Sequence, residues 1–412
     1  MSGLNFLNKL LDGVDVEWLS LGELGDFIRG NGLQKKDFVE SGFPAIHYGQ
    51  IYTRYGLSAD KTFTYVLPEL ANKLRKAQKN DLLLATTSEN DEDVVKPLAW
   101  LGDNVAISGD MMLFRHEQNV KYLAYFFQSE IFQTQKMKYI TGAKVRRVSS
   151  GDLSKIKIPI PSSNNPEKSL TIQSEIVRIL DKFTALTAEL TAELTAELNM
   201  RKKQYNYYRD QLLSFKEGEV EWKTLGEVAQ YSKTRISFEL LDERNYVGVD
   251  NLLQNRAGKS LSNHVPTSGK LTEFIPNDIL IGNIRPYLKK IWQADCIGGT
   301  NGDVLVIRCI DSSINTRYLY QILADDKFFE YNMQHAKGAK MPRGSKEDIM
   351  KYPIPVPPLT LQARIVEILN KFDTLTNSIT EGLPREIELR QKQYEYYRDL
   401  LFSFPKPETV SN

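Results

Sequence analysis

KQYNYYRDQLLSF at Lys203–Phe215 returns as KQYEYYRDLLFSF at Lys392–Phe404, with ten of the thirteen positions identical. Some thirty residues ahead of each copy lies a second matching phrase, QSEIVRILDKFTALT from Gln173 and QARIVEILNKFDTLT from Gln362. Both pairs are offset by 189 residues, so a segment of about forty residues is kept in each copy without insertion or deletion. The chain therefore contains an internal duplication.

Length and composition indicate a multidomain globular protein. A chain of 412 residues exceeds one ordinary core, so two or more domains are expected. With 41% hydrophobic and 25% charged residues, and no apolar run long enough to cross a bilayer, the composition is that of a soluble protein. The N-terminal stretch is acidic and lacks the apolar region of a signal peptide. Two cysteines, Cys296 and Cys309, fit a reducing compartment, so we expect a cytoplasmic protein without membrane association.

Both repeated segments have the apolar spacing of helices. The first copy contains three tandem TAEL units at Thr187–Leu198, and each four-residue unit advances its leucine about 40° around a helix. The second copy has Gly382-Leu383-Pro384 where the first has Glu193-Leu194-Thr195, and proline removes a backbone donor. The pattern predicts a long helix in the first copy and a helix that is kinked or broken near Pro384 in the second. Their apolar stripes are Ile172, Ile176, Leu180, Phe183, Leu186, Leu190, Leu194 and Leu198, and Leu361, Ile365, Leu369, Phe372, Leu375, Ile379 and Leu383.

Two helices of equal length, each with one apolar stripe, bury those stripes most simply against each other. One interpretation is that they are dimerisation helices with no further role. The other is an antiparallel coiled coil within the chain that acts as a spacer between the intervening regions. The constant 189-residue offset favours the spacer, because mutual packing keeps two lengths equal.

The intervening regions repeat faintly. Each opens on the phrase EW-x-x-LGE, at Glu17–Glu23 and Glu221–Glu227, and each closes on a proline-rich strand, IKIPIP or MKYPIPVPP. Between them KNDLLLATTSE parallels PNDILIGNIRPY, SGDMMLFR parallels NGDVLVIR, and KYLAYFFQSE parallels RYLYQILADD, a predicted helix. Backbone-determining residues are kept while the loops differ. Two binding modules with one scaffold and different ligands have this pattern, and simple drift after duplication is the alternative.

The predicted fold class is α+β: two α+β domains separated by two long helices that form an antiparallel coiled coil, with approximate internal twofold symmetry. The expected organisation is a first domain at 1–160, a first helical spacer at 161–218 with the TAEL units, a second domain at 219–355, a second helix at 356–405 kinked near Pro384, and a flexible tail at 406–412.

This order of variable region, long helix with KQYxYYRD, variable region and long helix resembles the specificity subunit of type I restriction–modification systems, over essentially the whole chain. The TAEL tandem looks like the type IC branch in particular. The resemblance implies that each variable region is a target recognition domain, which reads one half of a split DNA sequence. It also implies that the helices bind two modification subunits, through which restriction subunits join the complex.

The resemblance further implies that this chain binds no cofactor, and that S-adenosylmethionine, ATP and Mg²⁺ belong to partner subunits. The residues agree with a non-catalytic chain: the sequence has no D/N-P-P-Y/F motif of amino-methyltransferases. Gly258-Lys259-Ser260 imitates a phosphate loop, but Leu253 stands where its first glycine belongs. The four histidines are scattered and suggest neither a metal site nor a nucleophile.

The best candidate DNA contacts lie in Thr141–Arg147, TGAKVRR, and its counterpart Lys337–Arg343, KGAKMPR. Glycine lets a backbone approach closely, and the cations suit phosphate or guanine. A solvated basic loop is the alternative. The expected contacts are Lys144, Arg146, Arg147, Lys340 and Arg343.

Two further sets of residues combine amide, hydroxyl and charged groups that suit base edges. One follows the first predicted strand of each domain: His47, Tyr48, Gln50, Tyr52, Arg54, Asp250 and Asn251. For this set, ordinary turn chemistry is the alternative. The other follows a short apolar strand: Thr86, Thr87, Ser88, Asn283, Arg285 and Tyr287.

The repeated phrase supplies candidate partner contacts, because Tyr and Arg are favoured at protein interfaces. These candidates are Tyr205, Tyr208, Arg209, Tyr394, Tyr397 and Arg398. Packing against the neighbouring recognition domain is the alternative for these side chains.

The leading hypothesis is a DNA-sequence reader that assembles a methyltransferase and restriction complex. One alternative is a stand-alone DNA-binding regulator, which needs a basic surface that a net charge of +1 does not indicate. The other is a structural coiled-coil adaptor, which does not need two diverged modules.

Overall fold

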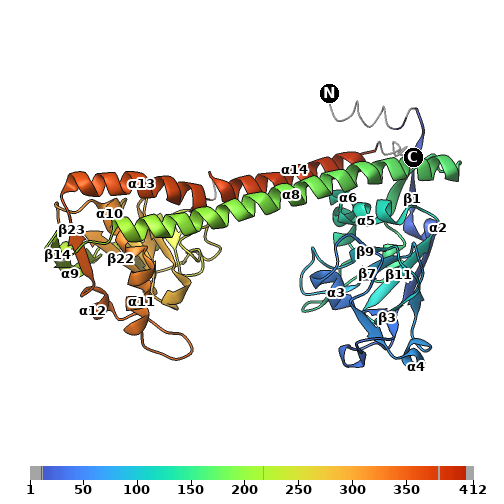
Figure 1. Ribbon diagram of the computed structural model, residues 1–412, viewed down its shortest axis with the longest axis horizontal. Helices are drawn as coiled ribbons and strands as arrows, with labels where there is room; N and C mark the ends of the chain where they lie inside the picture. The colour runs from blue at the N-terminus through green and yellow to red at the C-terminus, as the bar shows by residue number, and fades with distance from the viewer. Residues whose placement is uncertain (1–10, 12, 217, 379–380, 405–412) are drawn as a thin grey trace. The chain divides into compact units, whose positions relative to one another are not determined.

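The computed structural model describes residues 11, 13–216, 218–378 and 381–404. Contacts divide the chain into two units: Met1–Glu189 with Gln391–Asn412 form unit 1, and Leu190–Arg390 form unit 2. The predicted tail at 406–412 lies outside the described residues, as do the first ten residues, which belong to the stretch that argues against a signal peptide. Most helices and several strands of the two units are labelled in Figure 1.

In each unit the entry phrase forms a strand that pairs with the exit strand of the same copy. Trp18 lies opposite Pro159 in unit 1, and Trp222 lies opposite Pro355 in unit 2. A one-turn helix follows the entry strand in both units. These elements are β1 (Val16–Ser20), α2 (Leu21–Leu24) and β13 (Lys157–Pro161) in unit 1, and β14 (Glu221–Thr224), α9 (Leu225–Val228) and β23 (Pro353–Val356) in unit 2.

The inner strands of unit 1 form a five-stranded and a four-stranded sheet. The first contains β2 (Gly25–Arg29), β11 (Met111–His116), β7 (Leu82–Ala85), β9 (Lys96–Trp100) and β4 (Ser58–Ala59), in that order. The second contains β5 (Thr64–Val66), β3 (Phe43–Ile46), β10 (Val105–Ile107) and β6 (Lys76–Ala77), in that order. The remaining elements before the long helix are η1 (Lys35–Asp37), α3 (Tyr48–Thr53), α4 (Pro68–Ala71), β8 (Thr87–Ser88), α5 (Val120–Gln128), α6 (Glu130–Met137), β12 (Arg146–Arg147) and α7 (Ser150–Leu153).

Unit 2 repeats this scheme with two four-stranded sheets. The first contains β15 (Ala229–Tyr231), β22 (Val304–Cys309), β19 (Ile279–Gly282) and β20 (Ile291–Gln293), and the second contains β16 (Arg235–Ser237), β18 (Lys270–Phe274), β21 (Gly298–Thr300) and β17 (Tyr246–Val247). The other elements are η2 (Phe238–Leu240), η3 (Pro286–Leu288), α10 (Thr316–Leu323), α11 (Asp326–Gln334) and α12 (Lys346–Ile349). The predicted α+β class is confirmed, and the matching phrases form matching elements.

The phrases KND…MMLFR and PND…VLVIR encode the same ion pair, between a partly exposed arginine and a buried aspartate. Arg115 donates to both carboxylate oxygens of Asp81, at 3.0 and 2.7 Å. Arg308 donates to those of Asp278 at the same two distances. Both aspartates are almost fully buried. A bidentate pair fixes two neighbouring strands in register, which explains why these residues recur while the loops differ.

The first repeated segment forms one 47-residue helix, α8 (Pro166–Leu212), whereas the second forms α13 (Leu359–Asn377) and α14 (Leu383–Phe402). Pro384 is the second residue of α14, a position where the missing N–H costs nothing. The helix therefore breaks before Pro384 rather than at it. Gly382 has a φ of +81°, and a Cβ there would lie 2.5 Å from the carbonyl oxygen of Thr374, so glycine is required.

The apolar stripe of α8 does not pack only against another helix. Ile176 and Leu180 are fully buried in the core of unit 1, while Leu186 is exposed. Helix-to-helix contacts come from aromatic residues: Phe183 stacks on Tyr397 of α14 in unit 1. In unit 2, Tyr205 of α8 stacks on Phe372 of α13. Each unit thus contains a helix pair and a sheet-containing domain that share one core.

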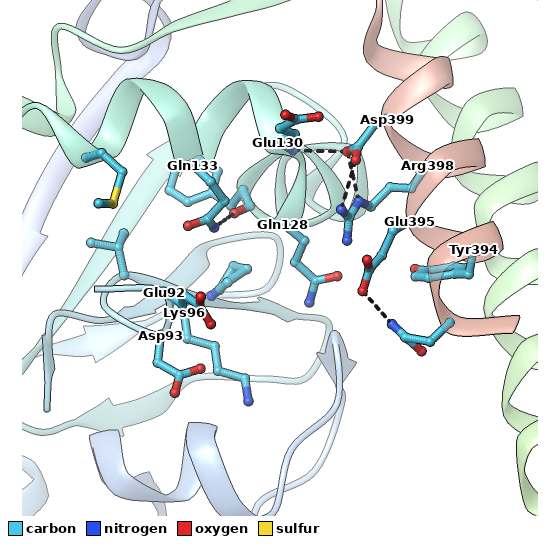
Figure 2. Close-up of a pocket in the computed structure, with 15 residues that line it drawn as sticks. Glu92, Asp93, Lys96, Gln128, Glu130, Gln133, Tyr394, Glu395, Arg398 and Asp399 are labelled. Atoms are coloured by element: carbon cyan, nitrogen blue, oxygen red, sulfur yellow. Dashed lines mark hydrogen bonds and ion pairs between the residues drawn. The ribbon is translucent and has the colours of Figure 1, made fainter. Parts of the chain in front are cut away.

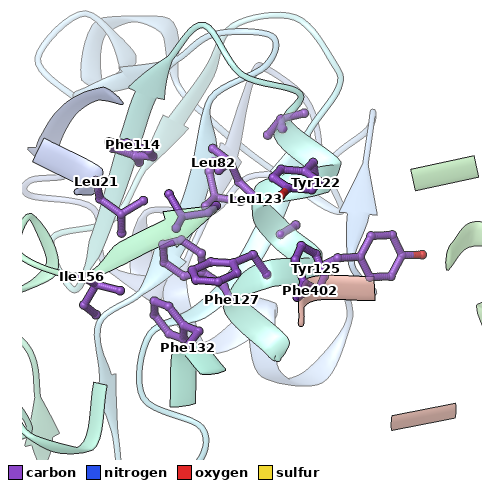
Figure 3. Close-up of a cluster of buried hydrophobic side chains, with 14 of the residues drawn as sticks. Leu21, Leu82, Phe114, Tyr122, Leu123, Tyr125, Phe127, Phe132, Ile156 and Phe402 are labelled. Atoms are coloured by element: carbon purple, nitrogen blue, oxygen red, sulfur yellow. The ribbon is translucent and has the colours of Figure 1, made fainter. Parts of the chain in front are cut away.

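The core of unit 1 includes side chains from the far end of the sequence. Phe402, at the end of α14, has no exposed surface, and its ring centroid lies 5.2 Å from that of Tyr122 and 5.6 Å from that of Phe126 (Figure 3). Leu401 and Phe404 join the same core. The first domain is therefore completed by the last helix.

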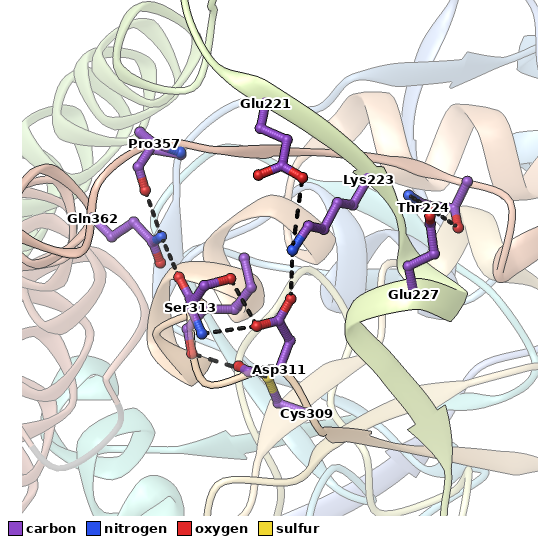
Figure 4. Close-up of polar contacts among 10 residues, drawn as sticks. Glu221, Lys223, Thr224, Glu227, Cys309, Asp311, Ser313, Pro357 and Gln362 are labelled. Carbon is purple, nitrogen blue, oxygen red and sulfur yellow. Dashed lines mark hydrogen bonds and ion pairs between the residues drawn. The ribbon is translucent and has the colours of Figure 1, made fainter.

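A buried glutamine near the start of each repeated segment attaches that helix to its domain. In unit 2, Gln362 Oε1 accepts from the Asn315 N–H at 2.8 Å, and its Nε2 donates to the carbonyls of Ser313 and Pro357 (Figure 4). Gln173 of unit 1 likewise accepts from the Asn119 N–H at 3.0 Å. Both glutamines are fully buried, so their hydrogen bonds are formed without competition from water.

Asp311 fixes the loop beside Gln362. Its carboxylate accepts from Lys223 Nζ at 2.9 Å and from the backbone N–H and hydroxyl of Ser313 (Figure 4). The hydrogen bond from Lys223, followed by those from Ser313, lowers the pKa of Asp311 to about 2. The entry strand β14 is thereby attached to the loop that precedes α10.

We expect Gln362→Leu to lower the free energy of unfolding of unit 2 by about 1–3 kcal/mol, because the apolar isostere leaves buried backbone groups unpaired. Gln173→Leu should do the same to unit 1. Urea denaturation followed by tryptophan fluorescence measures both effects. Gln254→Leu, at an exposed position, is the control, and an equal loss in that variant would contradict the role of the buried amides.

Candidate nucleic-acid interface

The two basic loops are hairpins of the same design. Thr141 and Arg147 exchange both backbone hydrogen bonds at 2.9 Å, and Lys337 and Arg343 do so at the same distance. Gly142 and Gly338 have φ values of +93° and +102°. A Cβ on Gly142 would lie 2.1 Å from the carbonyl oxygen of Val145, so this turn requires glycine.

Each hairpin docks against the end of a central strand. In unit 1, β12 pairs with β8, which sets Arg146 opposite Ser88 and Arg147 opposite Thr87. In unit 2, Arg343 forms a bridge with Ile284, and the Arg285 N–H donates to the Pro342 carbonyl at 2.7 Å. The structure therefore brings together the first and third predicted sets in both units, although they are about 55 residues apart in sequence.

The cations of the two hairpins and of the strand ends beside them differ in whether they form ion pairs within the protein. Arg146 is paired with Asp91 at 2.8 Å and also donates to the Gly142 carbonyl. Arg343 contacts Asp303 at 3.1 Å but keeps 57% of its side chain exposed. Lys144, Arg147, Lys340 and Arg285 are exposed, as is the ring of Tyr287. The exposed cations can reach a phosphate or a guanine without breaking an ion pair of the fold.

A depression of about 320 Å³ lies beside the hairpin of unit 1. Its lining includes Arg29, Thr86, Thr87, Thr141 and Arg147. Thr86 donates to the Asp110 carbonyl, whereas the buried hydroxyl of Thr87 has no hydrogen-bond partner among the described residues. The unpaired hydroxyl of Thr87 therefore belongs to a residue that lines the depression together with Arg29 and Arg147.

Arg29 was not among the predicted contacts. It ends β2, some 57 residues before Thr86, and only the strand order β2-β11-β7 brings it to the depression. Its guanidinium is held by a hydrogen bond to the Gly109 carbonyl at 3.1 Å. Lys233 occupies the matching place after β15 and is exposed. In the sequence, the signal for this contact is a cation at or just after the end of the second strand of each domain, Arg29 or Lys233.

The second predicted set is largely committed to the fold. His47 accepts from the Gly49 N–H, and Gln50 accepts from the His47 N–H, so together they cap α3. Burial lowers the pKa of His47. Asn251 is 3% exposed, accepts from the Gly248 N–H and donates to the carbonyls of Tyr246 and Ser260. These amides are engaged within the protein, as the turn-chemistry alternative predicts.

Tyr52 connects two of the sets. Its hydroxyl lies 3.2 Å from the Ala85 carbonyl oxygen and 3.0 Å from that of Thr87, and burial raises its pKa. It therefore holds α3 against the strand end that carries the hairpin. Of the same predicted set, Tyr48 is half-buried, while Arg54 and Asp250 are exposed. Asn283 is also buried, and its side-chain oxygen Oδ1 has no hydrogen-bond partner among the described residues.

The tyrosines of the repeated phrase separate into buried and exposed members. Tyr205 is 3% exposed and donates to Gln321 at 2.9 Å, and Arg209 stacks over its ring. Tyr394 contacts the Thr184 hydroxyl at 3.1 Å. Tyr208 and Tyr397 are partly exposed, but the most exposed tyrosines are Tyr207 and Tyr396, at 60% and 63%. Tyr205 and Arg209 thus pack against the recognition domain.

Two classes of site are not found in the part of the chain that the structure describes. No three residues among His, Cys, Asp and Glu are grouped so that they could hold a metal ion. No described helix is long and apolar enough to cross a membrane.

Comparison with known proteins agrees with this picture. The family model described as "Type I restriction modification DNA specificity domain" matches residues 13–200 and 217–389. The chain is 42% identical over 427 residues to the specificity subunit of the type I restriction enzyme EcoR124I/EcoR124II from Escherichia coli, with 100% of both chains covered. It is 34% identical to the EcoprrI specificity subunit from Escherichia coli, with 92% of this chain and 93% of the other covered.

A solved structure shares the fold. A chain from work on the complex assembly and conformational transition of the type I restriction–modification system aligns with a TM-score of 0.60 and 16% identity. The alignment covers 94% of this chain and 97% of that one.

Proposed function

Because the chain belongs to the family of type I restriction–modification specificity subunits, we propose that each of its two units reads one half of a bipartite DNA target through its basic hairpin and the strand end beside it. The chain recognises DNA sequence and is not an enzyme, and catalysis lies in other subunits of the complex. One observation carries the proposal. In each unit an arginine of the hairpin pairs with a residue at the strand end, Arg147 with Thr87 and Arg343 with Ile284, and the neighbouring residues differ between the units.

The exposed cations of the hairpins supply phosphate and guanine contacts, and the residues around them differ between units. In unit 1 these are Thr86, Thr87 and Ser88, with Arg29 across the depression. In unit 2 they are Asn283, Arg285 and Tyr287. Different hydrogen-bonding groups on the same backbone frame give two half-sites of different base sequence. Lys144, Arg146 and Lys340 contribute mainly to the phosphate backbone, which positions the protein without reading bases.

We assign the reading domains to residues 1–160 and 219–355, and the connecting helices to 161–218 and 356–405, as the sequence predicts. In this proposal an approximate twofold arrangement of the helices sets the distance between half-sites, because half-site spacing on DNA must match protein geometry. Two modification subunits dock on the repeated helices, and Tyr208, Tyr397 and the more exposed Tyr207 and Tyr396 offer the aromatic anchors.

In this proposal the partner subunits supply most of the affinity for DNA and bind the cofactors. With a net charge of +1, the chain alone neutralises few phosphates, so most of the affinity for DNA comes from the assembled complex. S-adenosylmethionine, ATP and Mg²⁺ are bound by the modification and restriction subunits. Since its ligand is DNA and its relatives are bacterial, we place the complex in the cytoplasm.

We expect Arg147→Ala and Arg343→Ala each to relax one half-site and leave the other unchanged. Loss of one base contact by arginine costs about 1–3 kcal/mol of discrimination, or roughly ten- to a hundredfold. Mapping of N6-methyladenine in DNA from cells that carry the assembled methyltransferase measures this effect. Each variant is the control for the other, because the two positions are equivalent in their hairpins.

The proposal fails if both variants lose methylation uniformly with both half-sites intact, since the arginines would then act only on phosphates. Tight, specific DNA binding by the isolated chain would instead favour a stand-alone regulator. We expect the isolated chain to bind DNA weakly and with a strong dependence on salt.

A further inference from the structure

The two units differ at one groove. In unit 1 this groove lies between α6 and the repeated helix α14, and the corresponding place in unit 2 is at the start of α11. Their correspondence is fixed by residues such as Tyr122 and Tyr318, whose hydroxyls donate to the matching Pro159 and Pro355 carbonyls. This 196-residue offset makes Glu130 at the start of α6 the counterpart of Asp326 at the start of α11.

In unit 2 the groove is filled by the chain's own arginine. Arg256 donates to the Ala324 carbonyl and to the Asp326 carboxylate, and its guanidinium lies 5.9 Å from the ring centroid of Phe329. Lys289 adds a second cation, 2.7 Å from the same carboxylate. Burial raises the pKa of Asp326, but the hydrogen bonds and charges of Lys289 and Arg256 outweigh it and lower the pKa, which keeps the carboxylate ionised.

The backbone of unit 2 is shaped to deliver this side chain. Asn255 and Arg256 have φ values of +56° and +64°, a region that costs about 1 kcal/mol or more for residues other than glycine. Their N–H groups donate to the carbonyls of Leu288 and Lys289, both at 2.9 Å. This backbone conformation therefore places the guanidinium of Arg256 against the carboxylate of Asp326.

In unit 1 the matching groove is open. It has a volume of about 710 Å³ and lies between the domain and α14 (Figure 2). Five carboxylates line it, against two cations, Lys96 and Arg398; the carboxylates are Glu92, Asp93, Glu130, Glu395 and Asp399. Arg398 is paired with Asp399, and Lys96 lies over the Tyr52 ring. Within the described part of unit 1, the Glu130 carboxylate has no ion-pair partner.

The charge of the groove selects the class of ligand. Carboxylates outnumber cations five to two, so the groove repels DNA phosphates and attracts a basic side chain. A guanidinium suits it better than an ammonium, because its planar fork can bind a carbonyl and a carboxylate together, as Arg256 does in unit 2. Met137, which lines the same groove and is 52% exposed, can cover the stem of the side chain.

We propose that this groove of unit 1 accepts an arginine side chain from the modification subunit, in the place that Arg256 occupies in unit 2. The inference rests on the proposed function, because it takes the modification subunit as the partner. It adds that unit 1 and unit 2 bind that partner differently. One groove receives an arginine from outside, and the other is already filled by the chain itself.

The test is a titration of the full-length chain with the purified modification subunit, followed by native mass spectrometry at fixed salt. We expect Glu130→Gln to weaken one binding step about ten- to a hundredfold, as the loss of a charge-assisted hydrogen bond predicts, and to leave any other step unchanged. Asp326→Asn makes the same change at the filled groove and should leave all binding steps unchanged. Equal effects of the two variants, or none from Glu130→Gln, overturn the proposal.

A photoreactive residue in place of Met137 gives an independent readout. Met137 lines the groove and is 52% exposed, so substitution there spares the core. Crosslinking to an arginine-containing peptide of the modification subunit supports the proposal, whereas crosslinking only to DNA or to a second copy of the chain overturns it. If the groove fails this test while Arg147→Ala and Arg343→Ala still relax one half-site each, the proposed function stands and only the inference is wrong.

Discussion

Replacing Phe402 with alanine lowers the free energy of unfolding of unit 1 by about 3–5 kcal/mol, the usual cost of removing a buried phenylalanine. Phe402 has no exposed surface and contacts the rings of Tyr122 and Phe126. The cavity would open at the junction of the last helix with the first domain. Because typical domains are stable by about 5–15 kcal/mol, this one substitution should remove a large fraction of the stability of the first unit.

The measurement needs a signal from one unit, since a chain with two units need not unfold in one step. Trp18 and Trp100 lie in unit 1, and Trp222 and Trp292 lie in unit 2. In a background with phenylalanine at 222 and 292, fluorescence during urea denaturation reports unit 1 alone. Tyr396→Ala, on the same helix at a 63% exposed position, is the control and should change stability by less than about 0.5 kcal/mol. Equal losses in both variants would refute the role of Phe402.

Deleting one TAEL unit, Thr195–Leu198, should abolish methylation of the original target and create a new target with the same half-sites and a shorter spacer. Four residues of helix contribute about 6 Å of length and leave a rotation of about 40°. The length corresponds to somewhat under two base-pair steps of about 3.4 Å. A displacement of this size far exceeds the 1 Å at which positioning errors already cost about a hundredfold, so the loss should be at least that large.

The half-sites should survive the deletion because the hairpins that we propose to read them are outside α8. N6-methyladenine mapping shows the half-sites and the spacer in one experiment. Glu197→Ala keeps the length of the helix and is the matched control; we expect its target to be unchanged. A deletion that altered the half-sites and kept the spacer would contradict the proposal that the length of α8 sets the spacer between the half-sites.

The duplication predicts the elements of this fold but not which helix completes which domain. The phrases KQYNYYRD and KQYEYYRD are so alike that either could pack against either domain. In the structure, Tyr205 packs against the second domain and Phe402 against the first. Such a choice depends on chain connectivity over about 200 residues, which local periodicity does not contain. Likewise, only the strand order places Arg29 beside Thr87.

The sequence indicated the positions of the candidate DNA contacts more closely where the backbone pattern was distinctive than where only residue type was used. The glycine-containing hairpins are exposed and meet the predicted strand ends. Gln50 and Asn251 were chosen because amides bind base edges, but amides also close turns and cap helices, and here they do so. The same amide group can bind a base edge or stabilise a turn, so its burial in the structure is needed to distinguish the two roles.

The dependence of the first domain on Phe402 has a consequence for biosynthesis. While the chain is being made, residues 1–189 emerge first but lack the side chains that finish their core. Unit 2 is encoded without interruption as Leu190–Arg390, so all of its residues are made before Phe402. Domains usually mature in the order of synthesis. In this protein the domain whose synthesis begins first should be the last to mature, because its core stays incomplete until Leu401, Phe402 and Phe404 have been made.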